Sequence, residues 1–283
     1  MKIFVPTDFS EGSKKAVHFA AQLAENFGAH MILAHAWYPA VTDAEFDNFN
    51  AVVTYDVFQK AAEEAIEGLA NEIDQKYAID IMTESLEGLA GDVIPASIHE
   101  HQPDLIIMGS RGMGMFGKAV LGSIAQRVID KVIQPVLIVP PTFEKVDIEH
   151  ITFASDFHDN DTSALKLLAK IGNIGAASIN VLHFDTDDTD MEKMETFMRI
   201  YESSVREEVP YPALEFELIQ QEDLIQGMDD YLAKTSVDLI GVSSTKKNVV
   251  QRFFNPSLTR HVLEHLKVPV LVFTAKDDPT NLF

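Results

Sequence analysis

The chain has 283 residues, of which 46% are hydrophobic and 23% are charged, so it is long enough for about two globular domains with separate cores. The net charge of −22 argues against a nucleic-acid surface, because phosphate backbones attract an excess of Lys and Arg. Cysteine is absent, which excludes disulfides, thiolate catalysis and zinc–thiolate sites.

The first half of the chain alternates short β-branched runs with amphipathic segments. Its opening residues predict a strand rather than a signal peptide, and no apolar run is long enough for a membrane span, so we expect a cytoplasmic protein. An extra aromatic-rich loop is expected at 38–55, covering either the cleft or a partner surface. Strands are predicted at 2–6, 30–36, 79–84, 104–109 and 135–139, and helices near 11–27, 55–77, 91–101 and 123–133.

Thr7 and Asp8 form the turn after the first predicted strand. Strands that alternate with helices of about ten residues or more pair in parallel, and ligands bind beyond the carboxyl ends of such strands. If the first and fourth strands are neighbours, this turn and the loop after Gly109 face one cleft. Asp8 then faces this cleft or serves as the N-cap of the helix near Ser10.

A glycine pattern, G-x2-G-x9-G-S, follows the fourth predicted strand and precedes the fourth predicted helix. Gly109 and Gly112 allow the chain to turn sharply and bring backbone N–H groups close to an anion, where a Cβ atom would intrude. Gly122 and Ser123 add the amides of a helix N-terminus, which attract negative charge. A strand, a glycine loop and a helix start in this order predict a phosphate-binding site.

Three side chains of this segment have alternative roles. The Ser123 hydroxyl either donates to a phosphate oxygen or, together with Gln126, forms a capping box for the helix. Arg111 and Lys118 either neutralise phosphate charge or face solvent. The sequence leaves these alternatives open.

The second half of the chain repeats the first. Residues 3–9 and 32–35 recur 148 positions later, and residues 103–106 and 135–139 recur 134 positions later. We therefore predict two doubly wound α/β domains, a nucleotide-binding one at 1–143 and a degenerate one at 144–283. Strands of the second copy are expected near 150–154, 178–184, 213–219, 237–242 and 269–273.

The second copy lacks the glycine pattern. Lys246 stands where close backbone approach is needed, and Pro256 removes an N–H donor. We therefore predict one nucleotide per chain, with the second copy serving as a scaffold or holding some other ligand. The matching positions are Gly109 and Ser243, Gly112 and Lys246, Gly122 and Pro256, and Ser123 and Ser257.

The histidines predict no catalytic or metal site. His35 and His183 end the second strand of each copy, and because one copy lacks the glycine loop, we expect both to serve packing or hydrogen bonding. Residues 261–265 spell H-x-x-E-H, which binds metal in some zinc peptidases, but the matching stretch 127–131 carries no such ligands. We therefore expect this stretch to be an ordinary helix.

The first strand with its turn (Pro6 to Ser10), the glycine pattern and the closing strand 135–139 resemble the universal stress protein family, and the resemblance covers both halves. It implies the strand order 3-2-1-4-5, ATP between strands 1 and 4, and a regulatory role in stress response. It also implies pairing of two units through their fifth strands, which gives an intrachain pseudo-dimer and leaves a homodimer open. The resemblance implies that Asp8 accepts from a ribose hydroxyl or a base, or helps to hold a magnesium ion. The ATP-binding subclass, with or without Mg, implies a site made of Pro6, Thr7, Asp8, Ala36, Met108, Gly109, Arg111, Gly112, Gly122, Ser123 and Ile124.

Two other functions compete with regulatory ATP binding. A slow ATPase is disfavoured because no general base, arginine finger or Walker lysine is identifiable, and no catalytic residue is assigned. A nucleotide-free module for dimerisation or partner binding is the second alternative. An ATP pyrophosphatase of related fold is disfavoured because the turn after the first strand lacks a glycine-rich phosphate loop.

Overall fold

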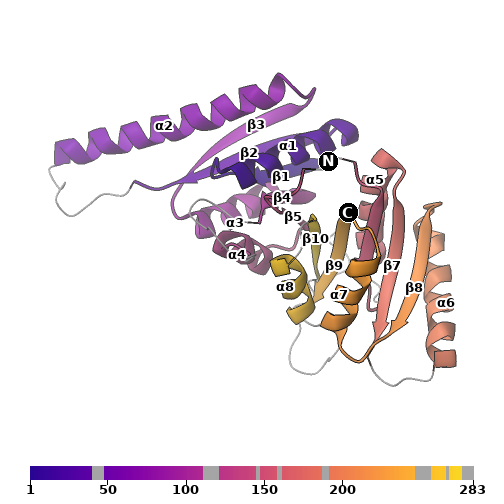
Figure 1. Ribbon diagram of the computed structural model, residues 1–283. Coiled ribbons are helices and arrows are strands. Elements are labelled where there is room, and N and C mark those ends of the chain that lie inside the picture. The colour runs from indigo at the N-terminus through magenta and orange to yellow at the C-terminus, as the bar shows by residue number, and fades with distance from the viewer. Residues whose placement is uncertain are drawn as a thin grey trace. The chain divides into compact units, whose positions relative to one another are not determined.

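Two compact units make up the chain, Met1–Pro141 and Thr142–Phe283, whereas the sequence-based boundary lies between 143 and 144. Figure 1 shows the computed structural model. Within its described residues, no helix combines the length and the apolar character needed to cross a membrane. The described residues are 1–39, 48–110, 121–144, 147–157, 161–186, 191–245, 256–265 and 268–275.

The first unit is a parallel sheet with the strand order β3-β2-β1-β4-β5. This order and the doubly wound α/β class confirm the fold expected from the sequence. The elements are β1 (Lys2–Pro6), α1 (Glu11–Phe27), β2 (His30–Trp37), α2 (Asn48–Asp74), β3 (Asp80–Glu87), α3 (Ala90–His101), β4 (Leu105–Gly109), α4 (Ser123–Lys131) and β5 (Val136–Val139).

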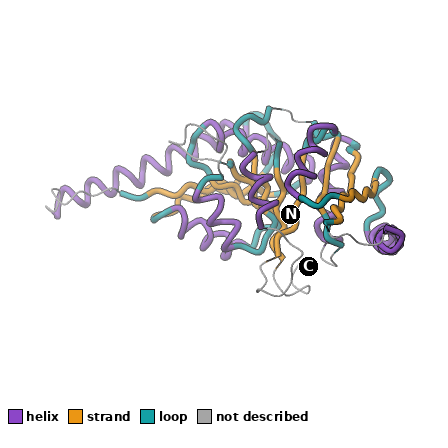
Figure 2. Tube along the Cα trace, turned by 60° about the horizontal axis from the view of Figure 1, so that its bottom comes forward, coloured by secondary structure: helices purple, strands orange, loops and turns teal. Residues whose placement is uncertain are grey.

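The second unit repeats this arrangement, with the parallel order β8-β7-β6-β9-β10. Figure 2 shows helices on both sides of the strands. The elements are β6 (His150–Ala154), α5 (Asp161–Gly175), β7 (Ser178–Asp185), α6 (Met191–Glu208), β8 (Leu214–Gln220), α7 (Leu224–Lys234), β9 (Leu239–Thr245), α8 (Pro256–His265) and β10 (Val270–Ala275).

The central strands of the first unit are buried, as their continuous apolar sequences predict. Residues 3–5 of β1 and 105–107 of β4 are fully buried, because helices cover both faces of a parallel sheet. Ile3 of β1 pairs with Leu105 of β4. The carboxyl ends of the two strands therefore meet at one edge, which brings the turn after β1 to the segment that follows β4.

The aromatic segment differs from its expected structure. Helix α2 begins at Asn48, so a large part of the predicted loop 38–55 is helical, and residues 40–47 lie outside the described residues. Tyr55 packs edge-to-face on Trp37 with ring centroids 5.4 Å apart, and its hydroxyl donates to Glu87 Oε2 at 2.7 Å. An edge-to-face aromatic pair and this hydrogen bond attach α2 at Tyr55 to the ends of β2 and β3.

An aspartate fastens the amino end of the first strand in both units. Lys2 N donates to Asp104 Oδ2 at 2.7 Å, and Glu149 N and His150 N both donate to Asp238 Oδ2 at 3.0 Å. Asp238 is buried. This buried carboxylate therefore accepts from two backbone donors at the start of β6.

We expect Asp238→Ala to lower the free energy of unfolding by about 1–3 kcal/mol, because it leaves these two N–H groups without that acceptor. Asp238→Asn keeps a side-chain oxygen and should cost less. Urea unfolding of both variants tests the effect. Two variants as stable as the wild type would show that the carboxylate is dispensable.

Candidate functional site

A cavity of about 330 Å³ opens at the carboxyl edge of the first sheet. Its size falls within the range typical of small-molecule sites. All the predicted site residues that the structure describes line it, whereas Arg111 and Gly112 lie outside the described residues. The lining consists of Pro6, Thr7, Asp8, Ser13, Ala36, Ala90, Ile94, Met108, Gly109, Ser110, Gly122, Ser123, Ile124 and Ala125.

Five of these lining residues were missed by the sequence analysis. Ser13 lies in the first turn of α1, and Ala90 and Ile94 lie in the first turns of α3. Helices that follow strands of a parallel sheet begin at its carboxyl edge, so the first turns of these helices were the available signal. The remaining two, Ser110 and Ala125, directly extend β4 and the start of α4.

The turn after β1 is held by a small hydrogen-bond network. Thr7 Oγ1 lies 3.1 Å from Ser13 Oγ and accepts from Phe9 N at 3.1 Å. The alternative that Asp8 caps α1 is wrong, since Ser10 is the N-cap and accepts from Ser13 N. Asp8 instead accepts from Ser10 N at 3.1 Å, which fixes its carboxylate at the cavity wall.

Gly109 is required by packing as well as by the cavity. A Cβ atom there would come within 3.2 Å of backbone atoms of Gly12 and Ser13, at the start of α1. Such contacts are tighter than ordinary packing allows, and backbone gives way less readily than a side chain. The glycine at position 109 therefore allows the end of β4 to pack closely against the start of α1. The glycine pattern alone did not reveal this contact.

The start of α4 presents its backbone to the cavity. Gly122 is the N-cap, with φ −65° and ψ 149°, and no side chain caps the helix. The capping-box alternative is therefore wrong, and Gln126 Nε2 donates to Asp130 Oδ1 at 3.1 Å instead. The first amides of a helix have no acceptor within it, so those of Ser123 and Ile124 remain available to a ligand.

The two ends of the glycine segment are tied together. Gly122 N donates to Ser110 O at 2.8 Å, and Ser110 N donates to Val139 O of β5 at 2.9 Å. These bonds anchor the entry and the exit of residues 111–120 to the sheet. The start of α4 is thereby held beside the end of β4.

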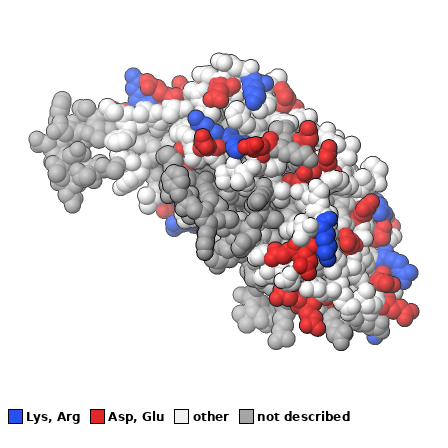
Figure 3. Space-filling model, in the orientation of Figure 1, with Lys and Arg blue, Asp and Glu red and all other residues white. Residues whose placement is uncertain are grey.

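Within the described lining of the cavity, an anion would bind mainly to backbone N–H groups. Asp8 is the charged side chain among the described lining residues, while Arg111 and Lys118 lie outside them. Figure 3 shows Lys and Arg interspersed with Asp and Glu over the described surface of one face, rather than gathered in a single patch. Among the described residues, no three His, Asp or Glu side chains group together as metal ligands would.

The histidines at the ends of β2 and β7 make the same contacts in both units. His35 Nδ1 lies 2.8 Å from Thr7 O, and His183 Nδ1 lies 2.8 Å from Ser155 O. Phe9 packs on the first ring and Phe157 on the second. Burial lowers the pKa of His183. The expected packing and hydrogen-bonding role is therefore confirmed.

Of the two residues that are expected to prevent phosphate binding in the second unit, Pro256 and Lys246, the structure describes Pro256. Pro256 is the first residue of α8, so this helix start lacks an N–H donor there. Lys246 lies outside the described residues. In the H-x-x-E-H stretch, His261 Nε2 pairs with Asp229 Oδ1 at 2.8 Å.

Known proteins share both the sequence of the first unit and the fold of the whole chain. The model of the universal stress protein family matches residues 1–140. A universal stress protein of Methanocaldococcus jannaschii is 30% identical over 141 residues, which are 49% of this chain and 81% of that protein. One of Thermus aquaticus is 30% identical over 138 residues, 48% of this chain and 96% of that protein.

A solved structure extends the likeness in fold to the second unit. The crystal structure of a universal stress protein from Archaeoglobus fulgidus has a TM-score of 0.71 and 18% identity, and the match covers 96% of this chain and 98% of that one. The low identity makes this evidence for the fold alone. The family model over residues 1–140 and the two relatives of 30% identity show that the chain belongs to the universal stress protein family.

Proposed function

We propose that the first unit binds ATP in the cavity at the carboxyl edge of its sheet, and that ATP occupancy serves a regulatory role in stress response. Family membership supports the stress-response role. The observation that carries the binding proposal is that residues from β1, β2, β4 and α4, selected as a nucleotide site from sequence, line one cavity.

In this proposal the phosphates lie against the start of α4. The amides of Ser123 and Ile124 point from a helix N-terminus, where backbone N–H groups and the helix dipole both favour an anion. A hydrogen bond to a charged acceptor contributes about 1.5–3 kcal/mol, so a few such amides suffice for selective binding of a polyphosphate. Gly112 and Arg111 would complete this end of the site.

The nucleoside lies at the other end, between β1 and β2. Ala36, Ile94 and Met108 supply apolar surface for a base, and the backbone near Ala36 offers polar groups to its edge. Asp8 accepts from the ribose or helps to hold a magnesium ion that accompanies the phosphates. Binding rather than rapid hydrolysis is proposed, because the described lining offers no cation or histidine to promote phosphoryl transfer.

Equilibrium dialysis of the purified chain with ATP, ADP and AMP, with and without Mg, tests the proposal. We expect affinity to fall in the order ATP, ADP, AMP, because the phosphates supply much of the binding energy. No affinity for ATP would contradict the proposal and favour a nucleotide-free module. Equal affinity for AMP and ATP would contradict the assignment of the helix amides.

Hydrolysis is measured on the same samples. ATP turnover that disappears in both Asp8→Ala and Gly122→Val would favour a slow ATPase at this site. Turnover that survives both substitutions would indicate a contaminating enzyme.

A further inference from the structure

The second unit has a pocket at the place that matches the first cavity, but it is nearly closed. It measures about 20 Å³, against about 330 Å³ in the first unit. The two pockets are formed by matching elements, since Pro6, Thr7 and Asp8 recur as Ala154, Ser155 and Asp156. Among the described residues, side chains that differ between the copies explain part of this difference in volume.

Two substitutions fill space that is open in the first unit. Ala36 of β2 corresponds to Phe184 of β7, because both lie two residues beyond the partner of the last residue of the first strand. Ala90 and Leu224 are the first residues of α3 and α7. At both positions the first unit has a methyl group and the second a large apolar side chain.

The ring of Phe184 packs closely against α7, because residue 227 of this helix is a glycine. Phe184 is buried, and a Cβ atom on Gly227 of α7 would come within 2.9 Å of its ring. The residue of α3 that matches Gly227 is Val93. The pair Ala36 and Val93 is thus exchanged for Phe184 and Gly227, so that the ring packs against the helix without strain.

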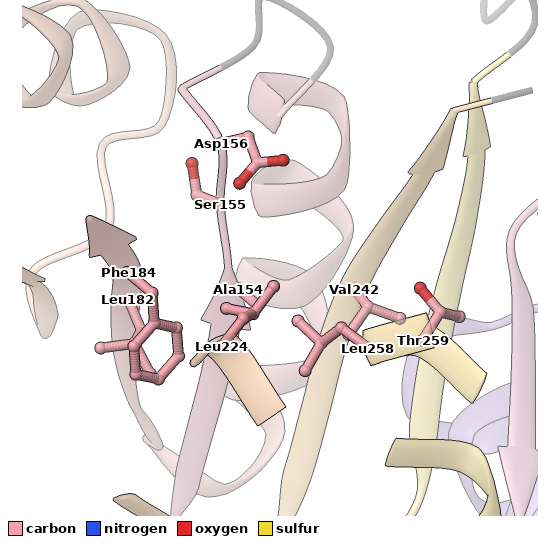
Figure 4. A pocket seen from close by; sticks show the side chains of 9 residues that line it. All are labelled: Ala154, Ser155, Asp156, Leu182, Phe184, Leu224, Val242, Leu258 and Thr259. Atoms are coloured by element: carbon pink, nitrogen blue, oxygen red, sulfur yellow. The ribbon is translucent and has the colours of Figure 1, made fainter. Parts of the chain in front are cut away.

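Figure 4 shows how the residues lie around the small pocket. Phe184, Leu224 and Leu258 gather in its lower part, and Ser155 and Asp156 lie above them. Phe184 and Leu224 occupy the part of the pocket that corresponds to Ala36 and Ala90 in the first unit, whereas Leu258 matches Ile124 at the start of α4. The missing glycine pattern affects the opposite end of the pocket, where phosphates would bind. Closure by Phe184 and Leu224 is therefore a second, separate obstacle to nucleotide binding.

We propose that the residues at 36 and 184 and at 90 and 224 determine which unit accepts a planar nucleobase, and that the residue at 93 or 227 only provides or denies room for the ring. This inference rests on the proposed function, because it assigns the base to the end of the first cavity near Ala36. Phe184 and Leu224 fill the matching space in the second unit with the chain's own side chains. Restoring glycines to the loop of the second unit would therefore not create a nucleotide site there.

A reciprocal exchange tests the proposal, with calorimetric titration of ATP and of adenosine. Ala36→Phe/Val93→Gly transfers the ring and its slot to the first unit, and we expect ATP affinity to fall at least 100-fold with the melting temperature largely kept. The matched control Val93→Gly opens the slot without the ring and should bind ATP as the wild type does. Wild-type affinity in the exchanged variant would overturn the proposal.

The opposite exchange, Phe184→Ala/Leu224→Ala/Gly227→Val, opens the second unit while refilling the slot. We expect it to gain one site for adenosine, which needs no phosphate contacts, while the first unit still takes one ATP. A folded variant with no new adenosine site would overturn the proposal. Should the triple variant fail to fold, Leu224→Ala alone must still gain weak adenosine binding.

These experiments distinguish a failure of the inference from a failure of the proposed function on which it rests. If the wild-type chain takes up no ATP, the proposed function fails, whereas the gain of adenosine binding in the second unit still reports on the closure. If the wild type binds ATP and neither exchange changes binding, the function stands and the inference fails.

Discussion

Ser123→Pro is expected to bind ATP about ten- to a hundred-fold more weakly than Ser123→Ala. Both variants lose the hydroxyl, and only the proline also loses a backbone N–H at the start of α4. One hydrogen bond to a charged phosphate, at about 1.5–3 kcal/mol, gives a loss of this size. Equilibrium dialysis of the two variants beside the wild type measures it.

The proline should leave the fold intact, which makes this pair of variants selective for the amide. Ser123 is the first residue of α4, a position that proline favours because its N–H has no acceptor in the helix. Gly122 has φ −65° and ψ 149°, the extended conformation required before proline. Equal ATP affinity of the two variants, with unchanged melting temperatures, would contradict a role for this amide.

Comparison of Ser123→Ala with the wild type addresses the hydroxyl separately. A loss of affinity would favour donation by the hydroxyl to a phosphate oxygen. Unchanged affinity would leave the backbone as the donor at this position.

Asp156→Asn is expected to stabilise the protein above neutral pH. Burial, together with the nearby carboxylate of Asp161, raises the pKa of Asp156 from its ordinary value of 3.8 to about 7. Asp161 stands where the first unit has Ser13, and its Oδ2 accepts from Ser155 at 2.6 Å and from Tyr201 at 2.9 Å. The second unit thus holds two acids close together, and ionisation of Asp156 opposes folding.

The direction of the pH dependence follows from this raised pKa. The unfolded chain loses the Asp156 proton near pH 4 and the folded chain near pH 7, so the contribution to stability is full below about pH 4 and is lost between pH 4 and 7. Above pH 7 the loss amounts to at most about 4 kcal/mol. Asp156→Asn avoids it, so its advantage over the wild type should appear on raising the pH from 4 to 8.

Urea unfolding at pH 4 and pH 8 measures this effect. Glu67→Gln, which removes an exposed carboxylate from α2, is the matched control and should show no comparable gain. A difference between Asp156→Asn and the wild type that is the same at both pH values would contradict the shifted titration.

The fold could be predicted from sequence because the signals for it are local or repeated. Apolar runs such as 105–108 and the amphipathic segments between them predict a doubly wound sheet, and the duplicated strands reinforce one another. The start of α2 was misplaced at about residue 55, whereas the helix begins at Asn48, and Tyr55 within it contacts Trp37 and Glu87. Residues that lie far apart in sequence make these contacts.

The candidate site was predictable where a glycine or a strand end marked it, and less so where tertiary packing decides a residue's role. The pattern identified Gly109, but its packing against Gly12 depends on how closely α1 approaches β4. Ser123 and Gln126 have capping-box spacing, yet Gly122 is the N-cap and the helix begins one residue earlier than a Ser123 cap requires. The repeat in sequence matches Ala36 with Phe184, but the filling of the second pocket by this ring also depends on its packing against Gly227 of α7.

A crystal structure with a non-hydrolysable ATP analogue tests the central claim most directly. We expect a triphosphate against the amides of Ser123 and Ile124, a base near Ala36, and no nucleotide in the second unit. An empty first cavity at saturating analogue, or phosphates placed away from the start of α4, would contradict the account.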